Sequence, residues 1–523
     1  MIAAAAFQDH RRALGGAALL VTALMTLGGV VQVAAAAWAA FNDPFELDYG
    51  EGIVWWQMLR IASGQGYAPI GVIPGVAFHY PPVYHLVTAA LAALTGADPL
   101  LAGRILSFAS AMASVLLIAR LAFAIMPQGV GAKPALIAAA LAGCVFACSP
   151  TVRFWSTLLR VDLLACALTL AGLWLTAEAM RRPSRSLWAA LVFALAVYTK
   201  QTAVIGPAAA SVALWVVRPR TAVMFFLTCA GLSFAALAAL QIGTDGGFLR
   251  HVLLYNVNRL DLDRWRLLAE ILAGQSVVLV LAAIAAGQAA SRLRAVGWSG
   301  LRAHVAAEPA DGVRLLALAY LIGRVATLPL ILKSGSSDNY LIDLFAAAAI
   351  FVGPAVAPVV AAIWAGTAWP RPVVVALTLA GLSIQNVPRL DVGRAGPRPV
   401  EYERLLSMIR DADGPVVSDD MVLLMRAGRP VLLEPAIVAE LAHKGLYDEA
   451  GLVRLIRARA FAFFVTAGRP TLRMFPERYN PAVAAAIAEA YPEREWLGGL
   501  TVHRPAAPPG QARSGGVASD RSR

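Results

Sequence analysis

Four carboxylates gather in the stretch FNDPFELDYGEGIVWW, between a long apolar run and a pair of tryptophans. They are Asp43, Glu46, Asp48 and Glu51. Asp48 and Glu51 are three residues apart, which is one turn if a helix begins at Asp48. A carboxylate placed in this way can act as a general base toward a hydroxyl, and a neighbouring acid with partial burial would raise its proton affinity. The alternative, that all four are solvated loop charges, stays open.

A second set of polar residues lies at the ends of apolar runs. These residues are expected on the same side of the membrane as the acids. Its members are His79, Tyr80, Arg160, Asp162, Lys200, Gln201, Lys333, Asn339 and Tyr340. Ionisable groups at membrane depth are rare and usually face a cavity or a partner. Arginine as a fork and lysine as a point charge could hold the phosphate of a lipid. Two alternatives stay open: Arg160 could pair internally near Asp162, and Lys333 could only extend to the interface.

The composition predicts a polytopic membrane protein. Of 523 residues, 59% are hydrophobic and 15% are charged, against about 25% charged in soluble domains. The net charge of +12 is explained by the excess of arginine and lysine in cytoplasmic loops. Because basic residues do not alternate with aromatic ones, we expect no nucleic-acid partner. The four cysteines lie in apolar runs and indicate no disulfide framework.

Apolar segments indicate about eleven crossings. They lie near 14–38, 101–125, 134–149, 157–180, 187–199, 202–217, 221–242, 266–290, 314–332, 341–364 and 372–388. Arginines and lysines alternate between loops in a way that predicts a cytoplasmic N-terminus and a C-terminal region outside the cytoplasm. We therefore expect a multi-pass membrane protein.

The segment from Leu187 to Val217 has two interpretations. It is either one long tilted helix or a hairpin of two short helices with Lys200 at its tip. Arginines at both ends favour the hairpin, because they place both ends on the cytoplasmic side.

Two short helices are expected to position the acids, within a first outer loop at 41–96. GIVWWQMLRIASG has two tryptophans and a mixed polar face, which suits a helix lying in the bilayer interface. FHYPPVYHLVTAALAALTG is also too short to cross comfortably and predicts a second interfacial helix. Such a loop would place Asp48 at the lipid–water boundary, within reach of a lipid head group.

The composition changes near Leu390, so we predict a membrane domain at 1–389 and a small α/β domain at 390–505. Helices are expected at EYERLLSMIRDAD, at AIVAELAHKGLYDEAGLVRLIRAR and at PAVAAAIAEAY. Strands are expected at GPVVSDD, RPVLLEP, FAFFVTAG and LTVHR. The tail at 506–523 is rich in Pro, Gly and Ser and is expected to be disordered.

No metal-binding or nucleotide-binding motif stands out. The seven histidines are scattered, and there is no P-loop and no GxGxxG after a strand. We therefore predict no metal ligands, although the sequence leaves a requirement for a divalent metal open. An enzyme working outside the cytoplasm without nucleotides would need its activated substrate on a lipid.

Several short motifs, taken in order, resemble the GT-C superfamily of polyprenyl-phosphate-dependent glycosyltransferases. They are LDYGEG at 47–52, HYPPVYHL at 79–86, GRILS at 103–107, SP at 149–150, LRVDLLA at 159–165, YTKQT at 198–202 and GSSDNYLID at 335–343. Within the superfamily, the chain is similar to the bacterial branch akin to protein O-mannosyltransferases and lipid A aminoarabinose transferases. The resemblance covers about residues 14–388 and implies a multi-pass protein of the bacterial inner membrane.

This resemblance implies a fold, a site and an activity. The family's first outer loop carries an essential acid, often in an Asp-Glu pair. If GEG is matched to DEG, Glu51 takes the glutamate place and Gly50 the aspartate place, but we prefer Asp48 as the base, with Glu51 second. For the donor's phosphate, Lys200 is the first candidate, followed by Arg160 and Lys333. Domains like that at 390–505 are thought to help acceptor binding in relatives.

The expected function is transfer of a sugar from a polyprenyl-phosphate sugar donor to a glycan, lipid or protein acceptor on the outer side, by an inverting displacement. The first rival is a lipid or solute transporter that uses the same outer cavity. The absence of internal repeats and the position of the acids at one surface count against it. A second rival is a non-catalytic membrane scaffold whose C-terminal domain binds a partner.

Overall fold

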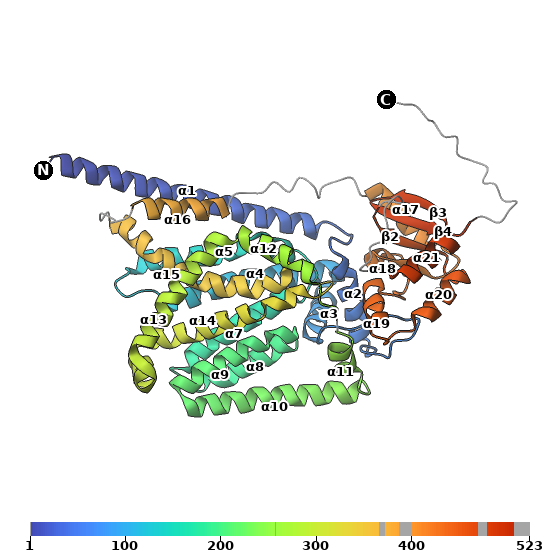
Figure 1. Ribbon diagram of the computed structural model, residues 1–523, viewed down its shortest axis with the longest axis horizontal. Helices are drawn as coiled ribbons and strands as arrows, with labels where there is room; N and C mark the ends of the chain where they lie inside the picture. The colour runs from blue at the N-terminus through green and yellow to red at the C-terminus, as the bar shows by residue number, and fades with distance from the viewer. Residues whose placement is uncertain (1, 257, 366–371, 386–398, 469–477, 507–523) are drawn as a thin grey trace. The chain divides into compact units, whose positions relative to one another are not determined.

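A computed structural model describes residues 2–256, 258–365, 372–385, 399–468 and 478–506 (Figure 1). Its contacts divide the chain into two compact units. The first, the helical unit, comprises 1–68 and 78–392, and the second comprises 69–77 and 393–523. A short segment of the first loop therefore belongs to the second unit. Apart from Ala506, the predicted tail at 506–523 lies outside the described residues.

The helical unit begins with a long helix, followed by the two short helices of the first loop. The elements up to residue 243 are α1 (Ile2–Phe41), α2 (Tyr49–Ala62), α3 (Val83–Thr95), α4 (Pro99–Ala124), α5 (Ala132–Cys148), α6 (Pro150–Trp155), α7 (Asp162–Ala179), α8 (Arg185–Val197), the 3-10 helix η1 (Gln201–Val204), α9 (Ile205–Val217) and α10 (Pro219–Gly243). The two interfacial helices expected in the first loop are thus present as α2 and α3.

Shorter turns alternate with long helices in the rest of this unit. These elements are α11 (Gly247–Leu249), the π-helical turn η2 (Arg250–Leu254), the 3-10 helix η3 (Leu262–Arg264), α12 (Trp265–Gly274), α13 (Ser276–Ala307), α14 (Pro309–Ala326), the 3-10 helices η4 (Leu328–Leu332) and η5 (Asp338–Leu341), α15 (Ile342–Ala365) and α16 (Pro372–Gln385). The segment predicted as one crossing at 266–290 is broken at Gln275, which adopts φ −112° and ψ 15°.

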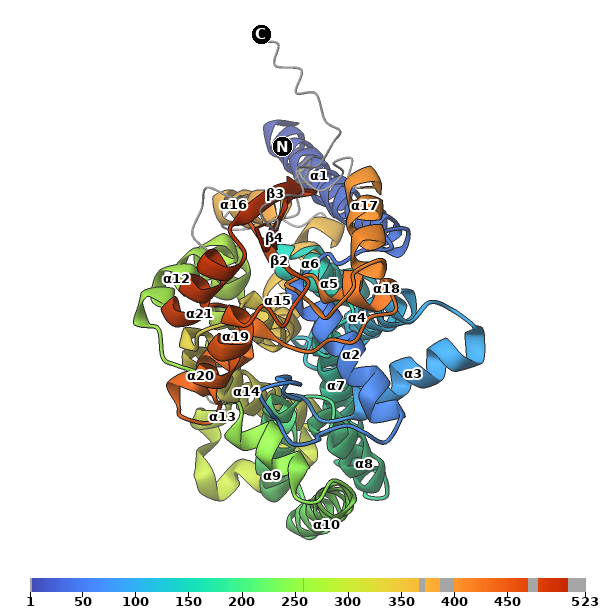
Figure 2. The ribbon, with the colours of Figure 1, turned by 90° about the vertical axis from the view of Figure 1, so that its right-hand side faces the viewer.

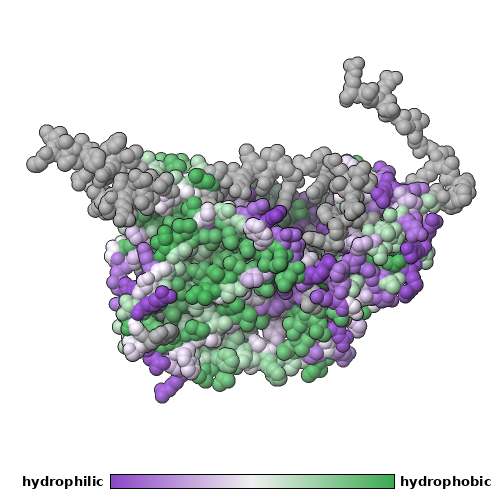
Figure 3. All heavy atoms as spheres, in the orientation of Figure 1, coloured by the Kyte–Doolittle hydropathy of each residue, from purple (hydrophilic) through white to green (hydrophobic). Residues whose placement is uncertain are grey.

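Seven helical spans among the described residues are long and apolar enough to cross a membrane, and shorter apolar helices accompany them. The span at Asp338–Ala365 is the most enclosed, and its helix α15 packs against α4, α5, α13 and α14. Elsewhere the unit exposes large apolar side chains such as Leu116, Phe226 and Phe234. Apolar residues also cover much of the face seen in Figure 3. The chain is therefore a polytopic helical membrane protein.

The segment at 187–217 is a hairpin. Helices α8 and α9 both pack against α7 and α10 (Figures 1 and 2). At the tip, Lys200 contacts Asp162 at the first turn of α7. At the base, Arg218 Nε donates a hydrogen bond to the carbonyl of Met180, just after α7 ends. Two short legs therefore replace the single tilted helix, as the flanking arginines favoured.

The second unit contains a four-stranded sheet in the order β1-β2-β4-β3. Its elements are α17 (Pro399–Arg410), β1 (Val416–Ser418), α18 (Met421–Arg426), α19 (Pro435–His443), α20 (Glu449–Arg457), β2 (Phe463–Ala467), α21 (Pro481–Ala490), β3 (Glu493–Leu497) and β4 (Leu500–Arg504). Strands β1 and β2 are parallel, whereas β4 pairs antiparallel with β2 and β3. Val417 thus lies opposite Phe464, and Val465 opposite Val502.

Three expectations for this unit were wrong or incomplete. The single helix predicted at 436–459 is split, because Gly445 takes a positive φ of 68° after α19. RPVLLEP is not a strand of the sheet, since Leu433 makes only an isolated bridge with Gly75. Strand β3 was not predicted, although Gly498 and Gly499 both have positive φ and supply the two-residue turn that a hairpin needs.

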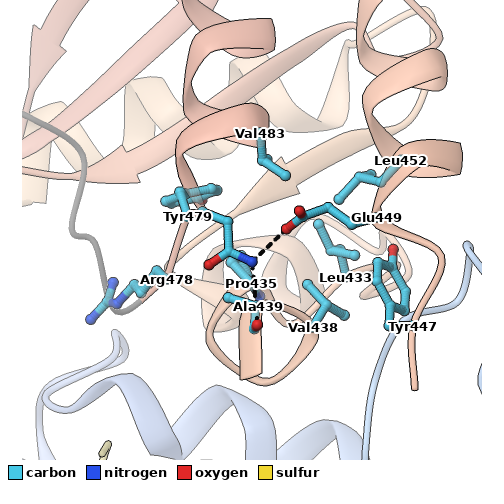
Figure 4. A pocket seen from close by; sticks show the side chains of 11 residues that line it. Leu433, Pro435, Val438, Ala439, Tyr447, Glu449, Leu452, Arg478, Tyr479 and Val483 are labelled. Atoms are coloured by element: carbon cyan, nitrogen blue, oxygen red, sulfur yellow. Dashed lines mark hydrogen bonds between the residues drawn. The ribbon is translucent and has the colours of Figure 1, made fainter. Parts of the chain in front are cut away.

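A small cavity in the second unit has a volume of about 10 Å³ (Figure 4), room for about one water molecule. Asn480 Nδ2 donates to Glu449 Oε1 across it, at 2.5 Å. Leu433, Tyr447 and Val483 are among its lining residues. It is too small for a sugar.

His251 bridges Ala68 and Phe78, the two residues of the helical unit that flank the segment 69–77. Its Nδ1 accepts a hydrogen bond from the Phe78 N–H at 3.1 Å, and its Nε2 lies 2.8 Å from the Ala68 carbonyl. This pattern requires the neutral ring with the proton on Nε2. Burial lowers the pKa of His251 to about 4, so the ring stays neutral at physiological pH.

The helical unit should lose thermal stability as the pH falls from 6.5 toward 4. The unfolded chain takes up a proton near pH 6.5, whereas folded His251 does not until about pH 4, so its contribution is complete above 6.5 and is lost on acidification. The shift corresponds to up to about 3 kcal/mol. Thermal unfolding in detergent between pH 7 and 4.5 measures it. His251→Gln should flatten part of this dependence, whereas His443→Gln, at an exposed histidine, should leave it unchanged. An identical pH profile for His251→Gln and wild type would contradict the assignment.

Candidate active site

Asp48 caps the N-terminus of α2. Its Oδ1 accepts a hydrogen bond from the Gly50 N–H at 3.1 Å and lies 3.3 Å from Arg160 Nη1. Both contacts use the same oxygen, and within the described residues Oδ2 makes none. The side chain remains 27% exposed. Asp48 therefore keeps a carboxylate oxygen that can accept a proton.

Glu51 lies one turn further along α2 and is completely buried. Arg104 of α4 donates two hydrogen bonds to it, from Nε to Oε1 at 2.8 Å and from Nη2 to Oε2 at 2.7 Å. The backbone N–H groups of Leu47 and Leu159 donate to the same two oxygens. With both oxygens doubly hydrogen-bonded and no exposed surface, Glu51 holds segments together and is poorly placed to take a substrate proton.

Arg104 was not among the predicted site residues, although it lies in the GRILS motif. Besides Glu51, its guanidinium donates to the carbonyls of Ala40, Asp43 and Phe45. It thereby fixes the chain between α1 and α2, where the acids lie. A buried arginine in an apolar helix was the signal that could have identified it.

The same motif supports the backbone of Arg160. The Ser107 hydroxyl donates to the Arg160 carbonyl at 3.1 Å, and Tyr84 hydrogen-bonds to both Ser107 and the Gly103 carbonyl. A Cβ atom at Gly103 would lie 2.4 Å from a side-chain carbon of Leu159, so glycine permits this close approach. α4 thus positions both acids and the arginine that faces them.

Arg160 is the cation nearest to Asp48. Its guanidinium carbon lies 5.0 Å from the centroid of the Trp155 ring. Its Nε is buried without a hydrogen-bond partner, and so is Asp162 Oδ2, 3.9 Å away. A guanidinium held by one oxygen of Asp48 and by an aromatic face, with its Nε unsatisfied, is suited to bind an oxyanion.

Lys200, Asp162 and residues of η5 form the inner part of the cluster. Lys200 Nζ lies 2.5 Å from Asp162 Oδ1 and 4.8 Å from the centroid of the Tyr340 ring. Asn339 Nδ2 donates to the same oxygen at 2.9 Å. Burial opposes the ammonium, but Asp162 raises the pKa of Lys200 above its ordinary value. Lys200 is therefore charged and already paired.

η5 is held in place by its first residue. Asp338 accepts hydrogen bonds from Trp155 Nε1 at 2.6 Å and from the Thr151 hydroxyl at 2.8 Å. Both donors lie on α6, which begins at Ser149 and Pro150 of the SP motif. The motif therefore positions Asn339 and Tyr340 together with the aromatic face beneath Arg160.

The remaining predicted residues are Tyr80, Gln201 and His79, which lie near the cluster or contact one another, and Lys333. Tyr80 lies in the electrostatic environment of Arg160 and Lys200, and burial raises its pKa to about 12. Gln201 Nε2 donates to the His79 carbonyl, and burial lowers the pKa of His79 to about 4, which leaves that ring neutral. The contacts of Lys333 among the described residues are backbone contacts with Leu260, Leu330 and Ser336, and none of them joins it to the cluster. Among the residues that the structure describes, no three His, Cys, Asp or Glu side chains are grouped to hold a metal.

Gly50 leaves room for the Arg160 guanidinium. A Cβ atom at position 50 would lie 1.2 Å from Arg160 Nη1 and 3.2 Å from Asp48 Oδ1. We expect Gly50→Ala to push the guanidinium away from Asp48. The rate of the sugar transfer predicted from the motifs should fall by at least about tenfold, with little change in thermal stability. Gly231→Ala, on α10 where an added Cβ atom would meet nothing within 4 Å, is the comparison. Wild-type turnover in Gly50→Ala would show that the position of Arg160 does not matter.

Comparisons with known proteins identify the fold. No protein-family model matches the chain, and no curated protein sequence matches it. Among solved structures, ArnT from Cupriavidus metallidurans in the apo state matches with a TM-score of 0.56 at 13% identity, over 91% of this chain and 98% of that one. The same protein bound to undecaprenyl phosphate matches with the same score and identity, over 94% and 98%. The oligosaccharyltransferase of Archaeoglobus fulgidus in the apo form gives 0.52 at 12% identity, over 86% and 69%.

These similarities establish that the chain has the GT-C fold predicted from its motifs, a polytopic helical unit followed by a small C-terminal α/β unit. The match to ArnT extends over nearly the whole length of both chains.

Proposed function

We propose that this protein is a membrane glycosyltransferase that takes a sugar from a polyprenyl-phosphate donor. The observation that carries the proposal is the pairing of a partly exposed carboxylate with an arginine whose Nε lacks a hydrogen-bond partner, where α2 and α7 begin. ArnT, which shares the fold, has been solved with undecaprenyl phosphate. A lipid phosphate is also the ligand that an unsatisfied guanidinium would recognise.

The reaction is a displacement at the anomeric carbon of the sugar. The acceptor hydroxyl gives its proton to Asp48 Oδ2 while its oxygen forms a bond to that carbon. The bond from the carbon to the phosphate oxygen breaks, and polyprenyl phosphate leaves with the electron pair. Arg160 stabilises the charge that grows on the phosphate. Attack opposite the leaving group inverts the configuration of the sugar.

The contacts favour Arg160 over Lys200 as the main phosphate ligand. Lys200 is already paired with Asp162 at 2.5 Å and covered by Tyr340. The formal charge of the cluster is zero, because it contains two carboxylates, Asp48 and Asp162, and two cations, Arg160 and Lys200. The donor phosphate would therefore bind the guanidinium of Arg160, while Lys200 keeps Asp162 ionised and in place. The donor site would be lined by His79, Tyr80, Gln201, Asn339 and Tyr340.

The site end of the helices is proposed to face the extracytoplasmic side of a bacterial inner membrane. Support comes from the loops at the other helix ends, which carry Arg181, Arg182, Arg185 and Arg218. Such a basic excess is typical of the cytoplasmic side. The acceptor would be a glycan, lipid or protein that reaches this side.

Release of polyprenyl phosphate tests the proposal. Purified protein is incubated with a panel of polyprenyl-phosphate pentoses and hexoses, with native membrane extract as the source of acceptor. We expect release with one donor, and a KM for that donor raised about tenfold or more in Arg160→Gln. Arg153→Gln, at an arginine that donates to Gln32 outside the cluster, should behave as wild type. Flux of the intact donor without release would instead favour a transporter.

A further inference from the structure

A large groove opens on the helical unit between α4, α5, α7 and α14. Its volume is about 1120 Å³, above the range of about 300–1,000 Å³ typical of small-molecule sites. Most of its lining is apolar and includes Leu116, Phe123 and Trp174. Leu116 and Phe123 are 68% and 47% exposed. In a membrane-spanning unit, such a surface favours a hydrocarbon chain over water.

Two arginines lie in the wall of this groove. The guanidinium carbon of Arg120 is 5.6 Å from the centroid of the Trp174 ring, and Arg181 follows the end of α7. Both are exposed, and neither side chain forms an ion pair or hydrogen bond with another described residue. Glu178 is the acid in the lining, so these three charges sum to +1.

Three other basic residues at the same helix ends, Arg218, Arg292 and Arg314, are already paired. Arg292 and Arg314 both contact the buried Asp311, and Arg314 also donates to the carbonyls of Ile125 and Met126. Arg218 donates to the Met180 carbonyl. Arg120 and Arg181 have no such partner among the described residues, and unlike the exposed Arg182 and Arg185 they line the groove, where they are available to an external anion.

The groove and the candidate active site lie at opposite ends of α7. This helix begins at Asp162 of the site and ends at Ala179, and its eighteen residues give a length of roughly 27 Å. That length is close to the thickness of the hydrocarbon core, about 30 Å. Arg181 therefore lies near the opposite membrane surface from Asp162, where the phosphates of the other lipid layer are found.

We propose that this groove is a binding site for one anionic phospholipid of that layer. An acyl chain lies along Leu116, Phe123 and Trp174, and the head-group phosphate binds Arg120 and Arg181. Basic pockets between transmembrane helices bind anionic head groups in this way. The site is separate from the proposed glycosyl transfer, and its occupancy can be measured without any sugar donor.

Native mass spectrometry of the delipidated full chain tests the proposal, with phosphatidylglycerol and phosphatidylcholine of identical chains as probes. We expect one phosphatidylglycerol to bind more tightly than phosphatidylcholine. The double variant Arg120→Gln/Arg181→Gln should bind phosphatidylglycerol about ten- to thirtyfold more weakly. The matched control Arg182→Gln/Arg185→Gln removes two exposed arginines at the same helix end that do not line the groove, and should bind as wild type.

A second variant tests the acyl chain. Ala119→Trp places a large side chain in the groove without removing charge, and should reduce binding of phosphatidylglycerol while thermal stability is kept. Equal binding of the two phospholipids by wild type, or equal losses in both double variants, would overturn the proposal. A preference for a polyprenyl phosphate over phosphatidylglycerol would overturn the assigned occupant.

Discussion

Asp48→Asn is expected to abolish release of polyprenyl phosphate while the protein remains folded. Asparagine keeps an oxygen that can cap α2 and accept from Gly50, and it is a good N-cap residue. It cannot take up the acceptor's proton. Loss of a general base costs about 10²–10⁴-fold in rate, so the residual turnover should lie near the detection limit. The measurement is donor turnover, beside thermal unfolding.

Asp98→Asn is the matched control. Asp98 caps α4 by accepting from the Leu100 and Leu101 N–H groups, the same structural task that Asp48 performs for α2. Its variant should keep turnover. If Asp48→Asn turned over donor at nearly the wild-type rate, or if Asp98→Asn lost activity to the same degree, Asp48 would be a capping residue and not the base.

Glu51→Gln should act mainly on stability. It removes the buried negative charge that faces Arg104, and breaking a buried ion pair costs about 3–5 kcal/mol because one charge stays uncompensated. We expect a large fall in the thermal unfolding temperature, together with poor yield of folded protein. Activity lost at low temperature should follow the fraction of protein that remains folded.

The comparison with Asp48→Asn separates the roles of the two acids. If Glu51→Gln were instead as stable as wild type and inactive, Glu51 would be the base and the present assignment would be reversed.

Local sequence signals were sufficient for most of the helical unit. Apolar runs predicted the helices, because each crossing must satisfy its backbone within lipid. Arginines at both ends of 187–217 favoured the hairpin that the contacts of Lys200 and Arg218 confirm. The order of short motifs indicated the GT-C fold, which the match to ArnT confirms.

The second unit shows where local signals were too weak. Only long-range pairing reveals that 69–77 of the first loop belongs with 393–523, through Gly75 and Leu433. The break between α19 and α20 follows from one glycine in a left-handed conformation. A helical pattern on both sides of Gly445 concealed it.

The sequence by itself determined the membrane class, the fold family and the set of polar residues from which a site could be built. It could not separate Asp48 from Glu51, because spacing treats them alike. The tertiary structure separates them through Arg104, which lies 53 positions from Glu51 along the chain and fully engages it in the core. Asp48 keeps a free oxygen beside Arg160. Such roles depend on contacts between segments far apart in the chain, and these exist only once the helices have packed.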